Sequence, residues 1–591
     1  MTFRTTWRKV AVVATAASML LVAGCSDDGG NGADPGPETP TITDPNGGAE
    51  TNGGDEDPIT EFPRNETLFS MGTMWAPPTS WNPIPFTGGA TGTLGLIYET
   101  LFNFNLDTLE LVPWLAESGS WVDDNTYVLV LRDGITWHDG EPLTTDDVVF
   151  SFEMGKVEGV SWGIDMWTML EEITVDGNAI TFVHADPRPQ QWDNILYTRG
   201  IMPKHIMGDW SGNELMTLAN DNPVGSGPFK YLSHGQDRQT FQRNDNWWGI
   251  EHLGMTFEMR FIVDLVNTSN EVALNLLQQG QLDISNNFLP GINQLVAQDI
   301  VGTYFDGAPF MLSANTAVLV PNHEREPMSD VNFRRALAYS INVDLIVASA
   351  FGDLVQSASP TGLFPVFDTF VNRDLVAQYG FTYDVERARE ILTEAGYVEA
   401  DNGYFAFPDG STMEVELIVP AGWTDWMDAA QLIQESASEA GIFINVNHPD
   451  AGNLDDRRTI GDFDLVINNW SQVSNTPWTW WGYVFSYPLG ESMWANFGRF
   501  PAAEAWTHVQ ALGRSTQGTP AFNEHSDALQ TIMLQELPMI PMWYNGLWAQ
   551  WTEGVWTGWP SGGQGAGWPS TWHGYWQLGM IDVLAALTLA N

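Results

Sequence analysis

LVPWLAESGSWVDDNTYVLVLRDGITWHDGEPLTTDDVVFSFE, residues 111–153, contains the patterns that decide the fold class. Residues 126–132 follow a period-two pattern that predicts a β-strand. Residues 144–155 open with a hydroxyl cap and acidic residues in the first turn, which predicts a helix. A strand followed closely by a helix indicates a mixed α/β architecture.

The same alternation continues along the chain. Further strands are predicted at residues 178–184, 281–285, 412–420 and 463–468. Further helices are predicted at residues 269–280, 330–342, 384–396 and 425–440. No internal repeat is visible, and 591 residues exceed what a single core supports, so we expect two or three α/β lobes.

The charge balance restricts the partners. The chain has 74 acidic and 23 basic residues, which gives a formal net charge of −51. Such a surface repels nucleic acid, anionic lipid and acidic substrates. We interpret it as a solvated acidic coat, suited to a salty medium that screens its self-repulsion.

The first residues have the pattern of an export signal. Arg4, Arg8 and Lys9 precede an apolar run at residues 10–24, which is too short for a confident membrane span. The run ends in VAGC (residues 22–25), which resembles a bacterial lipobox, although Val22 stands where Leu is commoner. Cys25 is the only cysteine in the chain, so a lipid-modified cysteine is favoured over an ordinary signal peptide with an incidental thiol.

An acidic, Gly- and Pro-rich segment at residues 25–62 follows and predicts a disordered tether. No later segment is long and apolar enough to span a membrane. We therefore expect an extracytoplasmic protein, held at the outer face of the cell membrane through its lipid alone.

The stretch quoted first closely resembles the signature block of the family 5 extracellular solute-binding proteins. These are the large oligopeptide- and oligosaccharide-binding components of bacterial ABC importers. NPVGSGPFK (222–230), followed by NWW (246–248), is similar to another block of the family. ALNLLQQGQLDIS, DVNFRRALAYSIN, ILTEAGY and LPMIPMWY match further blocks in the expected order, so the resemblance covers the chain after the tether.

The resemblance implies a three-lobed, periplasmic-binding-protein-like α/β fold of type II, in which two ligand-closing lobes are joined by a hinge and an extra lobe enlarges the structure. The implied boundaries are a signal peptide at 1–24, a tether at 25–62, lobe I at 63–104, 222–314 and 535–591, lobe II at 105–221, and lobe III at 315–534. Asn315 would lie near a crossing between lobes. The resemblance also implies a non-enzymatic monomer without cofactor or metal, whose partners are a small ligand and the membrane subunits of an ABC permease.

The ligand class has to be argued from residues 468–483, NNWSQVSNTPWTWWGY. Peptide-binding members carry a carboxylate for the ligand ammonium in a segment resembling "W.ADYPDP", and the acidic residues are missing here. Trp offers a flat face for sugar C–H groups, and Asn or Gln offers neutral hydrogen bonds. The candidate ligand-binding residues of this segment are Asn469, Trp470, Asn475, Trp478, Trp480 and Trp481.

Other segments agree with a sugar ligand. Residues 71–86 supply Trp75, Trp81 and Asn82, and the segment around ANFGRF supplies Trp494 and Asn496. Residues 554–572 resemble the "YWTGWP" tail of cellobiose- and other oligosaccharide-binding members. Trp423 and Trp426 either line the far wall of the cleft or cap a helix.

The sequence therefore predicts a receptor for a neutral oligosaccharide, with β-linked chains of the cello- or xylo-oligosaccharide kind favoured. A peptide-binding member of the same family is the alternative, and a buried carboxylate in the cleft would support it. A secreted glycosidase is a remote alternative, because 74 acidic residues allow a catalytic pair but nothing selects one. Neither a GxSxG elbow nor a cysteine nucleophile is present.

Overall fold

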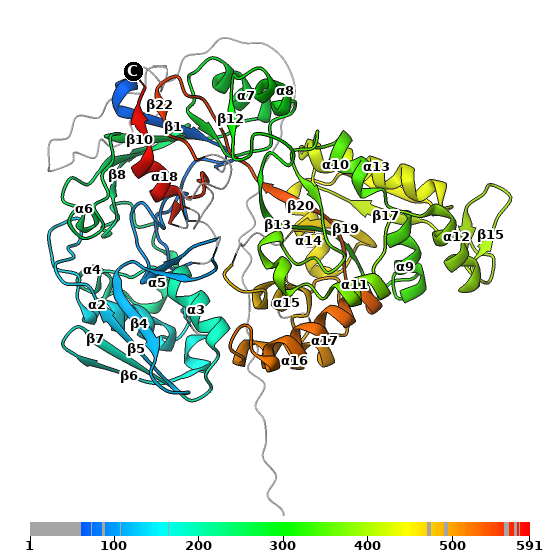
Figure 1. Cartoon of the computed structure of the whole chain (residues 1–591), viewed down its shortest axis with the longest axis horizontal. Helices are drawn as coiled ribbons and strands as arrows, with labels where there is room; N and C mark the ends of the chain where they lie inside the picture. The colour runs from blue at the N-terminus through cyan, green and yellow to red at the C-terminus, as the bar shows by residue number, and fades with distance from the viewer. Residues whose placement is uncertain are drawn as a thin grey trace, which may run out of the picture. The chain divides into compact units, whose positions relative to one another are not determined.

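Three β-sheets of four or more strands carry the described part of the fold (Figure 1). The computed structural model describes residues 61–72, 74–85, 89–106, 108–163, 165–469, 474–489, 495–560, 567–571, 576–577 and 579–590. These residues belong to one unit, Asp57–Asn591. The predicted signal peptide, Cys25 and most of the predicted tether lie outside the described residues. Phe62 packs its ring 5.2 Å from that of Phe261, so the packed body already includes the last residue assigned to the tether.

The seven-stranded sheet has the order β12-β21-β11-β1-β10-β9-β8. Its strands are β1 (Thr67–Met71), β8 (Phe229–His234), β9 (Arg238–Arg243), β10 (Phe261–Leu265), β11 (Ile284–Ser285), β12 (Gly302–Thr303) and β21 (Gln550–Trp551). The helices of these chain segments are α6 (Trp248–His252), α7 (Asn270–Gln278), α8 (Ile292–Ala297) and α18 (Met580–Ala586). β1 is parallel to both β10 and β11, and the sheet combines segments from the beginning, middle and end of the chain.

The four-stranded sheet is antiparallel, with the order β4-β5-β7-β6. Its strands are β4 (Ala116–Trp121), β5 (Thr126–Leu131), β6 (Leu170–Asp176) and β7 (Ala179–His184), and a hairpin of β2 (Phe102–Phe104) and β3 (Leu111–Pro113) precedes it. The helices here are α2 (Thr145–Glu153), α3 (Pro189–Thr198), α4 (Lys204–Met207) and α5 (Gly212–Thr217). Burial alternates along β5 and β7, as the period-two pattern predicts, and a capping box of Thr144 and Asp147 starts α2.

Glu99 lies where the four-stranded and seven-stranded sheets share one hydrophobic core. Its buried carboxylate accepts hydrogen bonds from the indole nitrogens of Trp114, Trp247 and Trp248 at 2.9, 3.1 and 2.9 Å. The hydroxyl of Ser226 donates a fourth, at 2.7 Å. These tryptophans therefore have a packing role.

The six-stranded sheet is mixed, with the order β14-β20-β13-β19-β17-β18. Its strands are β13 (Leu312–Pro321), β14 (Gln356–Ser357), β17 (Val415–Ile418), β18 (Ile444–Asn447), β19 (Leu465–Asn469) and β20 (Ile540–Leu547). Two further small pairs are formed by β15 (Val398–Glu399) with β16 (Phe405–Ala406) and by β22 (Trp556–Thr557) with β23 (Thr588–Leu589).

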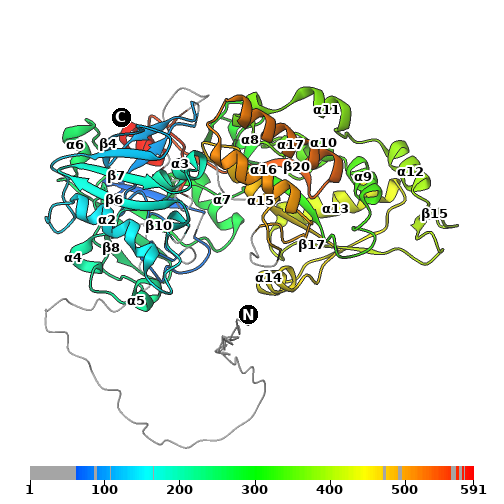
Figure 2. The same ribbon diagram turned by 90° about the horizontal axis from the view of Figure 1, so that it is seen from below.

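Helices cover this sheet, and Figure 2 shows α16 lying along α17. They are α9 (Val331–Ser340), α10 (Val343–Ser349), α11 (Arg373–Tyr379), α12 (Val385–Glu394), α13 (Thr424–Glu439), α14 (Ala451–Ile460), α15 (Trp478–Val484), α16 (Ala503–Arg514) and α17 (Pro520–Glu536). Ala317 and Leu319 of β13 enter one core, and Val318 and Val320 enter another, so this central strand is buried on both faces. The predicted helices α7, α9, α12 and α13 and the predicted strands β11, β17 and β19 are confirmed.

The chain crosses between the seven-stranded and six-stranded sheets at two adjacent points. β13 follows β12 by a short connection, and its antiparallel partner β20 leads into β21 after residues 548–549. β20, which belongs to the six-stranded sheet, follows the lobe boundary predicted between residues 534 and 535. The boundary predicted at residues 314–315 falls inside β13, three residues after the strand begins.

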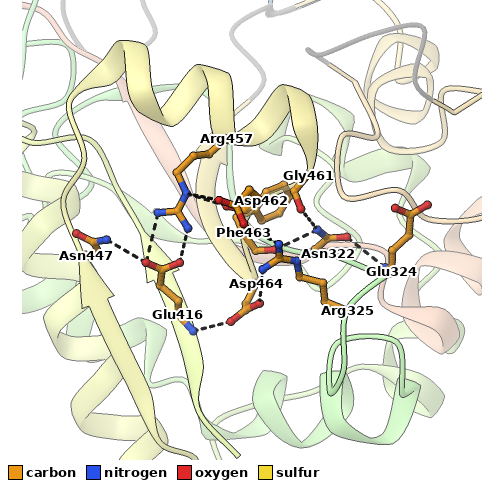
Figure 3. A network of polar contacts seen from close by, with 10 residues as sticks. All are labelled: Asn322, Glu324, Arg325, Glu416, Asn447, Arg457, Gly461, Asp462, Phe463 and Asp464. Atoms are coloured by element: carbon orange, nitrogen blue, oxygen red, sulfur yellow. Dashed lines mark hydrogen bonds and ion pairs between the residues drawn. The ribbon is translucent and has the colours of Figure 1, made fainter.

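A network of ion pairs and hydrogen bonds closes the far end of the six-stranded sheet, where β17 and β19 begin (Figure 3). Glu416 of β17 binds Arg457 of α14 and accepts a hydrogen bond from Asn447 at 2.9 Å. Arg325 pairs with Asp462 at 2.7 Å. Charge is thus concentrated at the amino-terminal ends of these strands.

Within the described residues, no helix combines the length and apolar character that a membrane span requires.

Candidate ligand-binding site

A cavity of about 410 Å³ lies where the seven-stranded and six-stranded sheets meet. One wall comes from residues that follow the carboxyl ends of β1 and β11, including Gly72 and Asn286. The other wall comes from the segment between β17 and α13 and from Asn469 at the end of β19. Carboxyl ends of parallel strands are the usual place for a ligand site in open α/β sheets.

Gly72 allows the first wall to close tightly. Its φ is +132°, and a Cβ atom there would lie 2.6 Å from the backbone carbon of Asn286. A larger residue would push the ends of β1 and β11 apart, so glycine is required by both backbone conformation and space.

The two strands that cross between the sheets form the floor. Asn315 of β13 and Asn545 of β20 are directly paired in the antiparallel register. Both residues line the cavity and are only 5% and 9% exposed, yet neither side-chain carbonyl oxygen has a hydrogen-bond partner within the part of the chain that the structure describes. Buried polar atoms are normally paired, so two unpaired acceptors at a cavity floor are suited to a ligand that donates hydrogen bonds.

Aromatic rings stand on both walls. Trp75 is 55% exposed and follows β1, whereas Trp423 is 48% exposed and follows β17. The Trp423 ring is held edge-on against Trp426, with centroids 5.0 Å apart and an interplanar angle of 78°. Trp548 and Phe288 form a second T-shaped pair at 5.3 Å. The cavity is thus bounded by broad ring surfaces from two different sheets.

The remaining polar side chains of the cavity are mainly amides. Six asparagines line it, namely Asn270, Asn286, Asn287, Asn315, Asn469 and Asn545. Asn286 is fixed to the wall, because it donates to the carbonyls of Trp548 and Pro569 at 2.6 and 2.8 Å. Asn287 donates to the side-chain oxygen of Asn270 at 2.7 Å. The side-chain oxygens of Asn315 and Asn545 make no such bond within the described part of the chain and keep accepting capacity for a ligand.

Asp425 is the only ionisable side chain among the described residues that line the cavity. It lies in the first turn of α13 between Trp423 and Trp426. Removal from bulk water raises its pKa to about 6, and the charge of Asp428 adds to the rise, while the backbone N–H groups of Trp426 and Asp425 oppose it. The carboxylate is therefore ionised at neutral pH and takes up a proton in mild acid.

The predicted site residues separate into three groups. Trp75, Asn315 and Asn469 line the cavity. Trp470 and Trp494 lie outside the described residues. The others are engaged in packing or in contacts between lobes.

Two predicted residues of the first wall are structural. Trp81 is fully buried, and its indole nitrogen donates to Gln239 at 3.1 Å. Asn82 donates to the carbonyls of Leu215 and Leu218, both at 2.9 Å. Their side-chain polar groups are therefore already used within the protein.

The tryptophans of residues 478–481 fall on α15 and turn into the core. Trp480 is fully buried and donates to the carbonyl of Thr361 at 3.1 Å, and the ring of Trp481 stacks on Phe485. Trp478 is half-buried against the same core. Rings without exposed surface cannot stack on a ligand in this arrangement, so the expected platform is not formed by α15.

Asn475 and Asn496 also have structural partners. The hydroxyl of Tyr197 in α3 donates to the side-chain oxygen of Asn475 at 3.1 Å, which joins the segment before α15 to the four-stranded lobe. Asn496 adopts a positive φ of 43° and donates to the carbonyls of Ser486 and Phe500. Asn496 therefore stabilises a turn.

The predicted site leaves out Asp425, which lines the cavity together with Trp423 and Trp426 in the segment WTDW at residues 423–426. The available signal was its position, directly after a predicted strand and at the start of a predicted helix. In α/β sheets that position faces the ligand crevice.

Comparison with known proteins identifies the fold. The model of the "Bacterial extracellular solute-binding proteins, family 5 Middle" matches residues 110–488, more than half of the chain. The protein belongs to family 5 of the extracellular solute-binding proteins. As a family 5 protein, it is a non-enzymatic, extracytoplasmic solute-binding component of an ABC import system.

Relatives within family 5 carry different ligand names. The dipeptide-binding protein of Escherichia coli (strain K12) is 26% identical over 438 residues, which cover 70% of this chain and 78% of that protein. A periplasmic oligopeptide-binding protein of Thermotoga maritima has a TM-score of 0.87 and 40% identity, covering 89% of this chain and 100% of that one. The structure of the Thermotoga protein with mannohexaose bound has a TM-score of 0.83 and 40% identity, covering 90% and 100%.

Proposed function

We propose that this family 5 protein captures a neutral oligosaccharide in the cavity between its two larger sheets and delivers it to an ABC permease. The observation that carries the proposal is that one cavity contains both the half-exposed rings of Trp75 and Trp423 and the amide oxygens of Asn315 and Asn545, which have no partner among the described residues. Pyranose rings have apolar C–H faces for the tryptophans and hydroxyl donors for the amide oxygens.

The charge of the cavity also favours a neutral ligand. A short free peptide carries both an ammonium and a carboxylate. Asp425 could pair with the ammonium, but no Lys, Arg or His is found among the described lining residues to pair with the carboxylate. An ionised group taken from water without a partner is strongly unfavourable, whereas a sugar brings no charge into the cavity.

Similarity to the mannohexaose-bound Thermotoga maritima protein supports the same ligand class. Manno-oligosaccharides therefore join the cello- and xylo-oligosaccharides favoured by the sequence. In this proposal each wall makes only part of the contacts to the ligand. Ligand binding therefore stabilises the closed arrangement, in which both walls contact the ligand at once. Cys25 carries the lipid that holds the receptor at the membrane.

A thermal-shift screen of the unit that begins at Asp57 tests the ligand class. The panel contains manno-, cello-, xylo- and laminari-oligosaccharides of increasing length, with a mixture of short peptides. A ligand specific to the folded state raises the melting temperature by mass action. We expect one neutral series to raise it with increasing length and then to level off. A shift with peptides alone would overturn the proposal.

A peptide ligand is the second candidate, and Asp425 is the observation that favours it, because a carboxylate between tryptophans is suited to an ammonium group. N-terminal acetylation distinguishes the two cases. Acetylation removes the cation, so it abolishes a peptide-induced shift that depends on Asp425.

A further inference from the structure

We propose that Asp425 and Trp423 form one subsite, which recognises two adjacent hydroxyls of a single pyranose ring and thereby sets the preference among neutral sugars. The inference rests on the proposed function, and it names the residue that would distinguish one sugar from another.

The geometry of α13 brings the carboxylate and the ring together. Both side chains belong to the turn that starts the helix, and both line the same cavity. Trp426 is 3% exposed and supports Trp423 from behind through the edge-on contact. The orientation of the exposed Trp423 face is therefore fixed relative to the helix that carries Asp425.

The carboxylate of Asp425 keeps accepting capacity for a ligand. The backbone N–H groups of Trp426 and of Asp425 itself donate to it, and no ion pair or hydrogen bond joins it to another side chain within the described part of the chain. Its place in the first turn of a 16-residue helix stabilises negative charge, because backbone N–H groups point toward that end. The structure thus keeps an accepting carboxylate at the cavity wall without neutralising it internally.

A carboxylate selects for a pair of donors. Its two oxygens lie side by side and only accept, so they match two neighbouring hydroxyls that both donate. Hydrogen bonds to an ionised acceptor are stronger than neutral ones. With the ring face of the sugar on Trp423, the tilt of the pyranose is restricted, and a change in hydroxyl configuration removes one of the two bonds.

The subsite is sensitive to pH in a defined direction. Its sugar-binding form is the carboxylate, and burial raises the pKa of Asp425 to about 6. Asp428 on the same helix contributes to the rise, and the lining residues from the other elements include no further ionisable side chain within the described part of the chain. Affinity should therefore fall as the pH falls through about 6, because protonation replaces one acceptor by a donor.

Isothermal titration of the protein with mannohexaose, cellohexaose and xylohexaose tests the subsite. Asp425→Asn preserves shape but replaces an acceptor by an NH2 group, and we expect it to weaken the best hexaose about 10- to 100-fold. Asp428→Asn is the matched control, because it removes the same charge from an exposed position outside the cavity wall. We expect this control to change affinity at pH 7.5 by less than about twofold.

The pH profile supplies a measurement that needs no variant. Wild-type affinity should drop between pH 7 and pH 5, and the profile of Asp425→Asn should be flat over that range. Equal affinities of wild type and Asp425→Asn, or a flat wild-type profile, would overturn this inference while leaving oligosaccharide binding intact. Failure of the wild type to bind any hexaose would overturn the proposed function and this inference with it.

Discussion

Asn315 and Asn545 are opposite one another on β13 and β20, and each presents a buried, unpartnered side-chain oxygen to the cavity floor. The same two strands carry the chain from one sheet to the other. A ligand bound to these oxygens therefore contacts the crossing itself as well as the two walls.

Replacement of Asn315 by Ala should weaken ligand affinity about tenfold, because a buried acceptor for the ligand is lost. The melting temperature of the ligand-free protein should change by at most about 2 °C, since the oxygen has no internal partner to lose. Titration calorimetry and thermal unfolding measure the two effects. A large loss of stability with unchanged affinity would contradict this role for Asn315.

Trp75→Ala and Trp423→Ala should each weaken oligosaccharide binding by about 1–3 kcal/mol, the range expected for removal of a large apolar contact surface. Both rings are about half exposed, so the ligand-free stability should change little. Trp480→Ala provides the contrast. This ring is fully buried, and its removal should lower the free energy of unfolding by about 3–5 kcal/mol. Denaturant titration and calorimetry on the three variants separate stacking from packing.

Arg514 at the end of α16 binds Asp186 before α3 through two hydrogen bonds of 2.8 and 2.7 Å, across the seam between the six-stranded and four-stranded lobes (Figure 1). We expect Arg514→Gln to weaken ligand affinity about two- to fivefold, because a partly exposed pair stabilises the closed arrangement by only about 0.2–1 kcal/mol. Small-angle scattering should show a more open ligand-free protein.

A matched control is Arg387→Gln, which breaks an exposed pair with Glu390 within α12. This variant should leave affinity unchanged. Equal behaviour of the Arg514 and Arg387 variants would show that the seam does not contribute to closure.

Glu99 should make stability depend on pH. Burial raises its pKa from 4.5 to about 7 in the folded protein, although its four hydrogen bonds oppose the rise. Since the folded pKa is above the unfolded one, the folded state binds the proton more tightly. The stabilising contribution is complete below about pH 4.5 and is lost as the pH rises to about 7.

Glu99→Gln cannot titrate, so the difference in unfolding free energy between wild type and variant should shrink from pH 4.5 to pH 7. Chemical denaturation at several pH values measures this difference. An increase of the difference with pH would mean that the hydrogen bonds from the three indole groups outweigh burial.

Salt should stabilise the protein. A net charge of −51 creates strong self-repulsion in the folded state, and added salt screens it. We expect the melting temperature to rise between about 0.05 M and 1 M sodium chloride, where the Debye length falls from about 14 to about 3 Å. A falling melting temperature over this range would indicate that the ion pairs contribute more than the repulsion.

The fold could be predicted because its elements follow local patterns. β5 and β7 alternate in burial, and α7 and α12 begin at side-chain caps that the sequence displays. The sheet that β20 joins could not be predicted, since β20 has the pattern of an apolar strand whichever sheet it joins. The pairing of β20 with β13 and with β14 assigns that strand to the six-stranded sheet.

The candidate site was only partly predictable, because aromatic composition is the same for a core and for a binding surface. Trp480 and Trp481 fall on the inner face of α15, whereas Trp423 precedes α13 with half of its surface exposed. Helix orientation decides between these outcomes, and it depends on tertiary packing. Asp425 could not be predicted as a site residue for a similar reason. Carboxylates are common in the first turn of a helix, and only the tertiary structure shows that this one lines a cavity.

The order of the strands along the chain also determines when the receptor can first bind. β20 and β21 supply part of the cavity floor and the strand that joins β11 to β12, and both lie beyond residue 539. A polypeptide leaving the cell amino terminus first therefore exposes Trp75 and Trp423 long before the site exists. With the site proposed above, a newly exported chain cannot complete the cavity until residues 540–551 have followed, so ligand capture waits for almost the whole molecule.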